Sequence, residues 1–114
     1  MNFYWQIDQF VETVSKNHVK PGKKILDIGA ESCKYKPLFT HLKYYSQDIR
    51  QNNSKTIDYV GNFSKIKSAS FDYILCTQVL EHLKDPHQAF KEFKRILKPN
   101  GQLFLTTNFI YQIH

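Results

Sequence analysis

The sequence is poor in cysteine and has no long apolar run. Its two cysteines, Cys33 and Cys76, lie far apart and show no metal-ligand spacing. This argues against a disulfide scaffold and favours a reducing, cytoplasmic setting with both residues as thiols. No apolar run approaches about 18 residues, so we expect no transmembrane helix and no membrane partner. The opening residues, MNFYWQIDQF, lack the basic region followed by an apolar stretch that is typical of a signal peptide.

Glycine is also scarce, with four residues in 114, and the motif G-x-G-x-x-G is absent. Even so, residues 24–35, KILDIGAESCKY, have the pattern of a buried parallel strand that runs through Asp27 into a tight turn at Gly29. Asp48 follows nineteen residues after Gly29, at the end of a second strand-like run, YYSQD. A glycine turn lets the backbone approach a nucleoside, and an acid at the next strand tip accepts hydrogen bonds from ribose hydroxyls. The alternatives are that Asp27 caps a helix or orients the loop, and that Asp48 is a solvated strand end.

Acidic residues are fewer than basic ones: the chain has ten Asp and Glu and sixteen Lys and Arg, which gives a net charge of +6. The basic residues are dispersed and intermixed with acids, as in the predicted helix that carries Lys91, Glu92, Lys94, Arg95 and Lys98. This dispersion favours ordinary solvated faces over a functional basic surface for RNA, phosphate or an acidic substrate. It disfavours nucleic acid as a partner.

The chain is long enough for one domain, residues 1–114, and its 41% hydrophobic and 15% aromatic content predicts a folded core. Helices and strands alternate, which indicates an α/β fold with a parallel sheet covered by helices. We expect strands over 24–29, 43–48, 57–60, 71–76 and 102–107, and helices over 3–18 and 35–42. A further helix is predicted with Asp85 as its N-cap, Pro86 in its first turn, and Pro99-Asn100-Gly101 after its end. The predicted core stripes are Phe3, Ile7, Phe10, Val11 and Val14 in the first helix, and Ala89, Phe90, Phe93, Ile96 and Leu97 in the last.

Four segments, in order, resemble the class I S-adenosylmethionine-dependent methyltransferases, especially the small-molecule methyltransferase domains. They are KKILDIGAESCKY, YYSQDI, FDYILCTQVLEHLKDP with its helix AFKEFKRILKPNG, and QLFLTTNF. The third segment is the most specific, and the resemblance covers about residues 20–110. It implies a Rossmann-like, doubly wound, mostly parallel sheet with strand order 3-2-1-4-5 and flanking helices. It also implies S-adenosylmethionine as the cofactor and a small-molecule methyl acceptor as the partner.

The resemblance assigns cofactor-binding roles to particular positions. The loop from Asp27 through Gly29 and Ala30 to Glu31 corresponds to the one that cradles the methionine part of the cofactor, and Asp48 to the acid that binds the ribose hydroxyls. The adenine would lie between Ile49 and Phe63, with its amino group near the amide oxygen of Asn62. The loop after the fourth strand would meet the sulfonium at Thr77 and Gln78.

Two departures from the family pattern stand out. Glu31 and Cys33 occupy positions where the family usually has glycine. Glu31 either crowds the methionine carboxylate, points outward, or pairs with the cofactor's amino group. In addition, the chain ends after the fifth strand, whereas the family's sheet continues, so the resemblance is to a fold without its last strands. The uncovered edge at 103–113 then predicts a homo-oligomer with apolar contacts from Phe109, Ile110, Tyr111 and Ile113, unless the tail covers its own sheet.

Catalytic residues are poorly marked, because methyl transfer mainly requires that the nucleophile be held in line and water excluded. Glu81 and His82 form a candidate acid–base pair, although they would equally serve to shape the loop. His82 and His87 do not share a helical face, so no metal site is expected. Tyr35 either lines the pocket or packs its helix against the sheet. Three functions follow: a small-molecule methyltransferase, a degenerate domain that binds cofactor or a partner without catalysis, and, least favoured, an RNA-associated methyltransferase.

Overall fold

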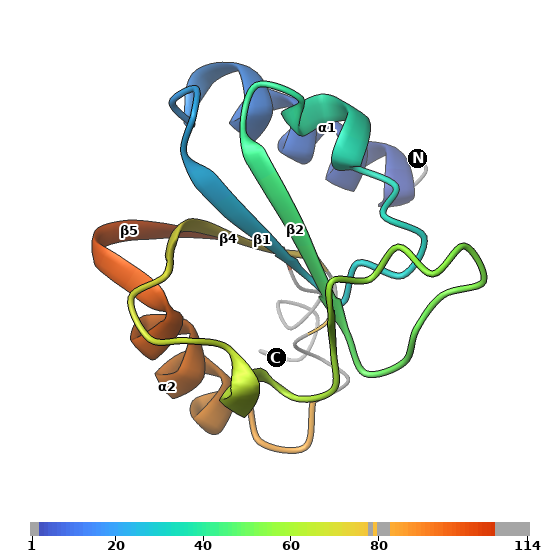
Figure 1. The fold of residues 1–114 in the computed structure, drawn as a ribbon. Helices are drawn as coiled ribbons and strands as arrows, with labels where there is room; N and C mark the ends of the chain where they lie inside the picture. The colour runs from blue at the N-terminus through green and yellow to red at the C-terminus, as the bar shows by residue number, and fades with distance from the viewer. Residues whose placement is uncertain (1–2, 78, 80–82, 107–114) are drawn as a thin grey trace, which may run out of the picture.

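The computed structural model of the chain describes residues 3–77, 79 and 83–106. A five-stranded sheet with order β3-β2-β1-β4-β5 forms its centre, and every neighbouring pair of strands is parallel (Figure 1). This confirms the predicted α/β class and strand order. The elements are α1 (Phe3–Asn17), β1 (Lys24–Ile28), the 3-10 turn η1 (Lys36–Phe39), β2 (Lys43–Asp48), β3 (Tyr59–Val60), the 3-10 turn η2 (Phe63–Lys65), β4 (Phe71–Thr77), α2 (Pro86–Ile96) and β5 (Leu97–Thr106).

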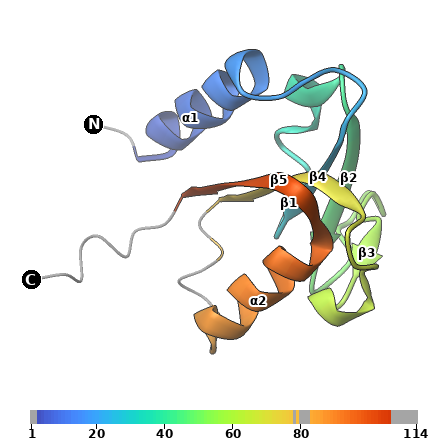
Figure 2. The same ribbon diagram turned by 90° about the vertical axis from the view of Figure 1, so that its left-hand side faces the viewer.

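The two long helices lie on opposite faces of the sheet, so the molecule has three layers (Figure 2). One core cluster lies under α1 and contains Val11 and Val14 with Phe39 and Leu75. The other lies under α2 and contains Phe93 and Ile96 packed against strand residues. The central strands β1 and β4 are mostly apolar, as expected for strands that are covered on both faces of a parallel sheet. None of the helices in the described part of the chain is long and apolar enough to cross a membrane.

The first helix forms where its apolar periodicity predicts it. Ile7, Val11 and Val14 are buried and Phe10 is half-buried, which confirms these four positions of the stripe, whereas the side chain of Phe3 lies outside the described part of the chain. Two side-chain contacts attach the region of η1 to α1. The Tyr35 hydroxyl donates to Asp8 at 2.7 Å, and a ring nitrogen of His41 lies 2.9 Å from the carbonyl oxygen of Ser15.

The second helix begins as predicted. The Asp85 side chain accepts a hydrogen bond from the Gln88 amide at 3.2 Å, and Pro86 occupies the first turn. Ala89, Phe93 and Ile96 are buried, but Phe90 is 39% exposed. The assignment of Phe90 to the core was therefore wrong. The residue lies at the border of the apolar stripe, where the helical spacing alone does not decide burial.

Three predicted bounds differ from the structure. The expected helix over 35–42 is only a single 3-10 turn at Lys36–Phe39, and the third strand is Tyr59–Val60 rather than 57–60. The last strand begins at Leu97, directly after α2, rather than at residue 102. Leu97 pairs with Phe71 and Gln102 pairs with Tyr73, so the intervening residues bulge from the ladder.

The Pro-Asn-Gly sequence that was expected to form a separate turn lies within this bulge. Asn100 has a φ of 68°, and a Cβ at Gly101 would lie 2.9 Å from the Lys98 carbonyl oxygen. The turn residues therefore interrupt the ladder locally instead of delaying the strand.

Candidate functional site

The site forms at the edge where the parallel strands end, beginning with the turn at Gly29. This residue has a φ of +64°, and a Cβ placed on it would lie 2.3 Å from a methyl carbon of Val79, in the segment after β4. Glycine is therefore required both by backbone conformation and by close packing. The structure confirms the predicted tight turn and brings the ends of β1 and β4 together there.

A buried glutamine connects three strand ends. Gln47 is 2% exposed. Its side-chain oxygen lies 3.2 Å from the Gly29 amide, and its side-chain nitrogen donates to the Gly61 carbonyl at 2.7 Å. The Gly61 amide in turn donates to the main-chain carbonyl of Asp48 at 2.9 Å. Gln47 was not among the residues predicted for the site, although a polar side chain in a buried strand indicates that it needs fixed hydrogen-bond partners.

The loop after the turn adopts a glycine-like backbone without glycine. Glu31 and Cys33 have φ values of 51° and 59°, in the left-handed region. The side chain of Glu31 is exposed, whereas Cys33 is buried with its sulfur 3.6 Å from the Thr56 hydroxyl. The two positions where the resemblance leads one to expect glycine therefore keep the conformation that glycine favours.

Asp48 holds this loop from the tip of β2. One carboxylate oxygen accepts from the Glu31 amide at 2.9 Å, and the other accepts from the Ile49 amide at 2.7 Å. Each oxygen retains a further lone pair, so two more hydroxyl groups can be accommodated. The carboxylate borders a groove of about 520 Å³. That groove is lined by Glu31, Ser32, Asp48, Arg50, Gln51, Asn52, Asn53 and Ser54.

Asp27 lies below the loop rather than on the wall of the groove. It is 2% exposed and accepts a hydrogen bond from the Tyr44 hydroxyl at 2.5 Å. Burial raises the pKa of Asp27 to about 7; the Tyr44 hydrogen bond opposes this rise, and the charge of Asp48 adds to it. These contacts fit the alternative in which Asp27 orients the loop. Its contact with the cofactor stays a prediction.

The residues assigned to the adenine follow two different strands: Ile49 comes directly after β2, and Asn62 and Phe63 come after β3. Ile49 is 59% exposed, so its side chain is accessible to a ligand. Phe63 is half-buried with its ring 5.3 Å from that of Phe93. The amide oxygen of Asn62 accepts from the amide and hydroxyl of Ser64 and so caps η2. The adenine contacts of these residues stay predictions.

Thr77 ends β4 and pairs with Thr106 at the tip of β5. The Thr106 hydroxyl is buried and has no hydrogen-bond partner among the described residues. Gln78, Glu81 and His82 lie outside the described residues, so the predicted sulfonium contact of Gln78 and the acid–base pair are not located.

No cluster of three or more His, Cys, Asp or Glu side chains suited to a metal ion occurs in the described part of the chain. Tyr35 packs between α1 and the sheet through its contact with Asp8.

The sequence profile of the family described as a methyltransferase domain matches residues 26–105, well over half of the chain. The chain belongs to the methyltransferase domain family. The match spans the Gly29 turn, Asp48 and both β4 and α2, so the site lies in the part of the chain that defines the family.

Curated relatives and solved structures agree with this membership. The ubiquinone biosynthesis O-methyltransferase of Actinobacillus pleuropneumoniae serotype 5b is 39% identical over 62 residues, which are 54% of this chain and 26% of that protein. The matched segment thus spans about a quarter of the length of that relative. The PH0226 protein of Pyrococcus horikoshii has a TM-score of 0.77 at 20% identity, covering 99% of this chain and 62% of that one.

A third similar structure is phosphoethanolamine N-methyltransferase 2 of Haemonchus contortus, in complex with S-adenosyl-L-methionine. It has a TM-score of 0.70 at 21% identity and covers 88% of this chain and 28% of that one. At these identities the structural likeness establishes the fold alone, and the chemistry has to be argued from the site.

Proposed function

We propose that this methyltransferase domain binds S-adenosylmethionine and forms the cofactor half of an enzyme that methylates a small molecule. The observation that carries the proposal is the position of Asp48. It stands on the wall of the groove at the tip of β2, and its carboxylate holds the main chain of the loop that follows Gly29. An acid and a glycine turn on neighbouring parallel strands are suited to a nucleoside.

The residues present fit this cofactor. Asp48 has acceptor capacity for both ribose hydroxyls, and Ile49 offers an exposed apolar surface for the adenine. The turn at Gly29 lets the segment after β4 approach the end of β1, where a Cβ would lie 2.3 Å from a methyl carbon of Val79. We assign the methionine part of the cofactor to the loop that follows this turn. When bound, S-adenosylmethionine supplies an electrophilic methyl group, so the protein's task is to orient the acceptor and exclude water. We assign the sulfonium end to Thr77 and Gln78 and keep Glu81 and His82 as the candidate acid–base pair.

The printed names of the relatives support a small-molecule acceptor. One similar protein is an O-methyltransferase of ubiquinone biosynthesis and another is a phosphoethanolamine N-methyltransferase. We infer that the acceptor of this chain is likewise a small hydroxyl or amine compound. We also infer a cytoplasmic location, because both cysteines are buried thiols, as expected in a reducing compartment.

One observation favours a second candidate function, in which the domain binds cofactor without transferring the methyl group. Glu31 places a carboxylate on the groove wall at a position where the family usually has glycine. A carboxylate there opposes the carboxylate of the methionine part. A turnover assay with S-adenosylmethionine and small hydroxyl and amine acceptors separates the two functions, because only the first consumes the cofactor.

Calorimetric titration with S-adenosylhomocysteine tests cofactor binding directly. We expect Asp48→Ala to weaken binding by about 1.5–3 kcal/mol, the range for hydrogen bonds to a charged group. Glu12→Ala is the matched control, since it removes an exposed carboxylate from α1, away from the groove. Equal affinity of the wild type and Asp48→Ala would remove Asp48 from the site, and absence of binding by the wild type would refute the proposed function.

A further inference from the structure

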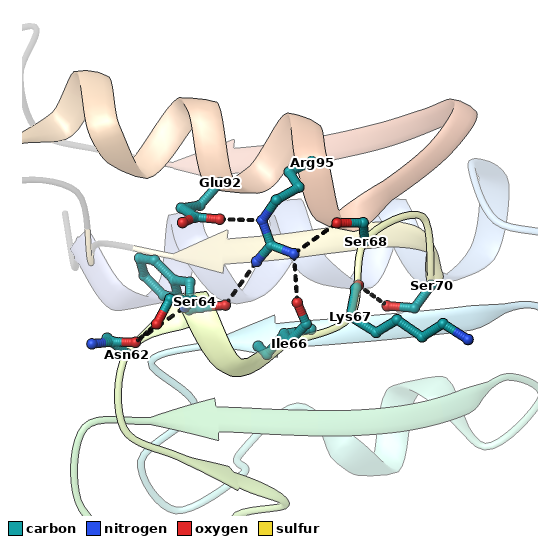
Figure 3. Close-up of polar contacts among 9 residues, drawn as sticks. Asn62, Ser64, Ile66, Lys67, Ser68, Ser70, Glu92 and Arg95 are labelled. Atoms are coloured by element: carbon teal, nitrogen blue, oxygen red, sulfur yellow. Dashed lines mark hydrogen bonds and ion pairs between the residues drawn. The ribbon is translucent and has the colours of Figure 1, made fainter.

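Arg95, near the end of α2, reaches across to the loop between β3 and β4 (Figure 3). One terminal nitrogen of its guanidinium donates to the Ile66 carbonyl at 2.6 Å and to the Ser68 hydroxyl at 3.0 Å. The other donates to the Phe63 carbonyl at 3.0 Å. The third guanidinium nitrogen, Nε, donates to the carboxylate of Glu92, one helical turn earlier.

These side-chain contacts add to main-chain contacts that hold the loop at both of its ends. Residues 61–70 contain only the short turn η2 and contribute no strand. Ile66 is buried in the core, and the amides of Ala69 and Ser70 donate to the last carbonyls of α2 at 2.8 Å each. These anchors hold the far end of the loop. The near end is attached at Gly61, whose carbonyl accepts from the Gln47 side chain and whose amide donates to the Asp48 carbonyl. Beyond Gly61, the position of Phe63 is fixed by the guanidinium and by the packing of its ring on Phe93.

Arginine is suited to this role in a way that lysine is not. Its planar group presents several donors in a fixed arrangement, so a single side chain can fix two carbonyls and a hydroxyl at once. The Glu92 carboxylate, whose side chain is 18% exposed, sets the orientation of that plane and balances its charge. A lysine would keep the charge but could not reproduce the arrangement.

We propose that Arg95 is a positioning residue that sets the adenine end of the cofactor site through the main chain of Phe63. The inference rests on the proposed binding of S-adenosylmethionine. In this arrangement α2, which contributes no side chain to the groove at Asp48, determines where Asn62 and Phe63 stand relative to β2. The preference of the site for adenine over other bases then depends on Arg95, a residue of α2.

The experiment compares two ligands by calorimetry, S-adenosylhomocysteine and its deaminated analogue S-inosylhomocysteine, which lacks the amino group assigned to Asn62. We expect Arg95→Lys to weaken binding of the adenine ligand about tenfold, the value of one lost hydrogen bond, and to weaken the inosine ligand much less. The ratio of the two affinities therefore falls. Lys94→Met, at the exposed neighbouring position, is the matched control and should keep the wild-type ratio.

A purely structural role would lower the melting temperature and leave the ratio of affinities unchanged, so an unchanged ratio in Arg95→Lys overturns the proposal. If that variant does not fold, Glu92→Ala keeps Arg95 and removes only the group that orients it, and the ratio should fall in the same direction by a smaller factor. Wild-type protein that binds neither ligand would refute the proposed function and this inference with it. Wild-type binding with an unaltered ratio in both variants would refute only the role of Arg95.

Discussion

At the scale of single residues, the loop after Gly29 carries the main functional information. Glu31 and Cys33 hold φ values that glycine adopts without steric cost. For other residues a left-handed conformation costs roughly 1–2 kcal/mol. The surrounding contacts offset this cost, because the Glu31 amide is bound by Asp48 and its carbonyl accepts from the Asn52 side chain at 2.8 Å.

Replacing Glu31 by glycine separates the effects of the backbone and the carboxylate. We expect Glu31→Gly to stabilise the fold by about 0.5–1 kcal/mol, since relief of the left-handed strain exceeds the greater entropy of the unfolded chain. We also expect S-adenosylhomocysteine to bind about threefold more tightly, because a carboxylate no longer faces another carboxylate. Urea denaturation and calorimetry measure the two effects.

Glu31→Gln is the matched variant, since it removes the charge and keeps the side chain. It should reproduce the gain in affinity without the gain in stability. Weaker binding by Glu31→Gly would instead indicate that the carboxylate contacts the cofactor's amino group.

Asp27 makes stability depend on pH. Because burial raises its pKa to about 7, the folded state holds a proton that the unfolded state loses at lower pH. This contribution to stability is complete at low pH, and it falls as the pH rises from about 4 to about 7, with a slope on the order of 1.4 kcal/mol per pH unit. We expect Asp27→Asn to remove this fall in urea denaturation curves.

Tyr44→Phe provides the comparison for Asp27. The lost hydrogen bond is the contact that lowers the pKa of Asp27, so the fall in stability should extend to higher pH in this variant. Identical pH profiles for the wild type and Asp27→Asn would show that Asp27 is ionised in the folded state throughout this range.

At the scale of elements, the connection between β2 and β3 acts as a clamp on the loop that follows Gly29. The clamp consists of Gln51, Asn52 and Thr56. Gln51 bonds both the amide and the carbonyl of Ile57, at 2.8 and 3.0 Å. Asn52 donates to the Thr56 hydroxyl at 2.6 Å and accepts from the Thr56 amide at 2.9 Å, while it also reaches the Glu31 carbonyl. A segment without regular structure is thereby given a defined shape.

Removing the central side chain of the clamp should loosen the site. We expect Asn52→Ala to destabilise the fold by about 1–2 kcal/mol, because three hydrogen bonds are lost and the carbonyl of Glu31 is left to solvent. The free energy of unfolding measured with urea checks this value, and calorimetry should show weaker binding of S-adenosylhomocysteine. Asn53→Ala, at the exposed next position, should change stability by less than about 0.5 kcal/mol. Equal stability of both variants would mean that the clamp is not formed in solution.

At the scale of the whole molecule, β5 lies at one edge of the sheet, beside β4. Leu103, Phe104 and Leu105 are half-buried along it. The predicted apolar contacts at Phe109 to Ile113 lie outside the described residues. An apolar strand edge can pair with another chain, and self-association through residues 103–113 remains our expectation.

Sedimentation at micromolar concentration tests this expectation. We expect a homodimer or higher oligomer whose proportion rises with protein concentration. A monomer over the whole range, with the segment 103–113 protected from proteolysis, would instead indicate that the chain covers its own edge.

The amino-acid sequence by itself determined the alternation of strands and helices, the turn at Gly29 and the acid at Asp48, whereas the order of the strands was implied by the family resemblance. Apolar runs and turn residues act locally, and parallel strands place their ends on one edge of the sheet. Only the tertiary structure decided the bridge made by Gln47, the attachment by Arg95 of the loop between β3 and β4, and the exposure of Phe90. The first two depend on contacts between residues far apart in the chain. The exposure of Phe90 depends on which residues at the border of the apolar stripe of α2 contact a neighbouring element. Local periodicity carries no information about either. The same holds for the left-handed backbone at Glu31, which is stabilised by Asp48 and Asn52 from other elements.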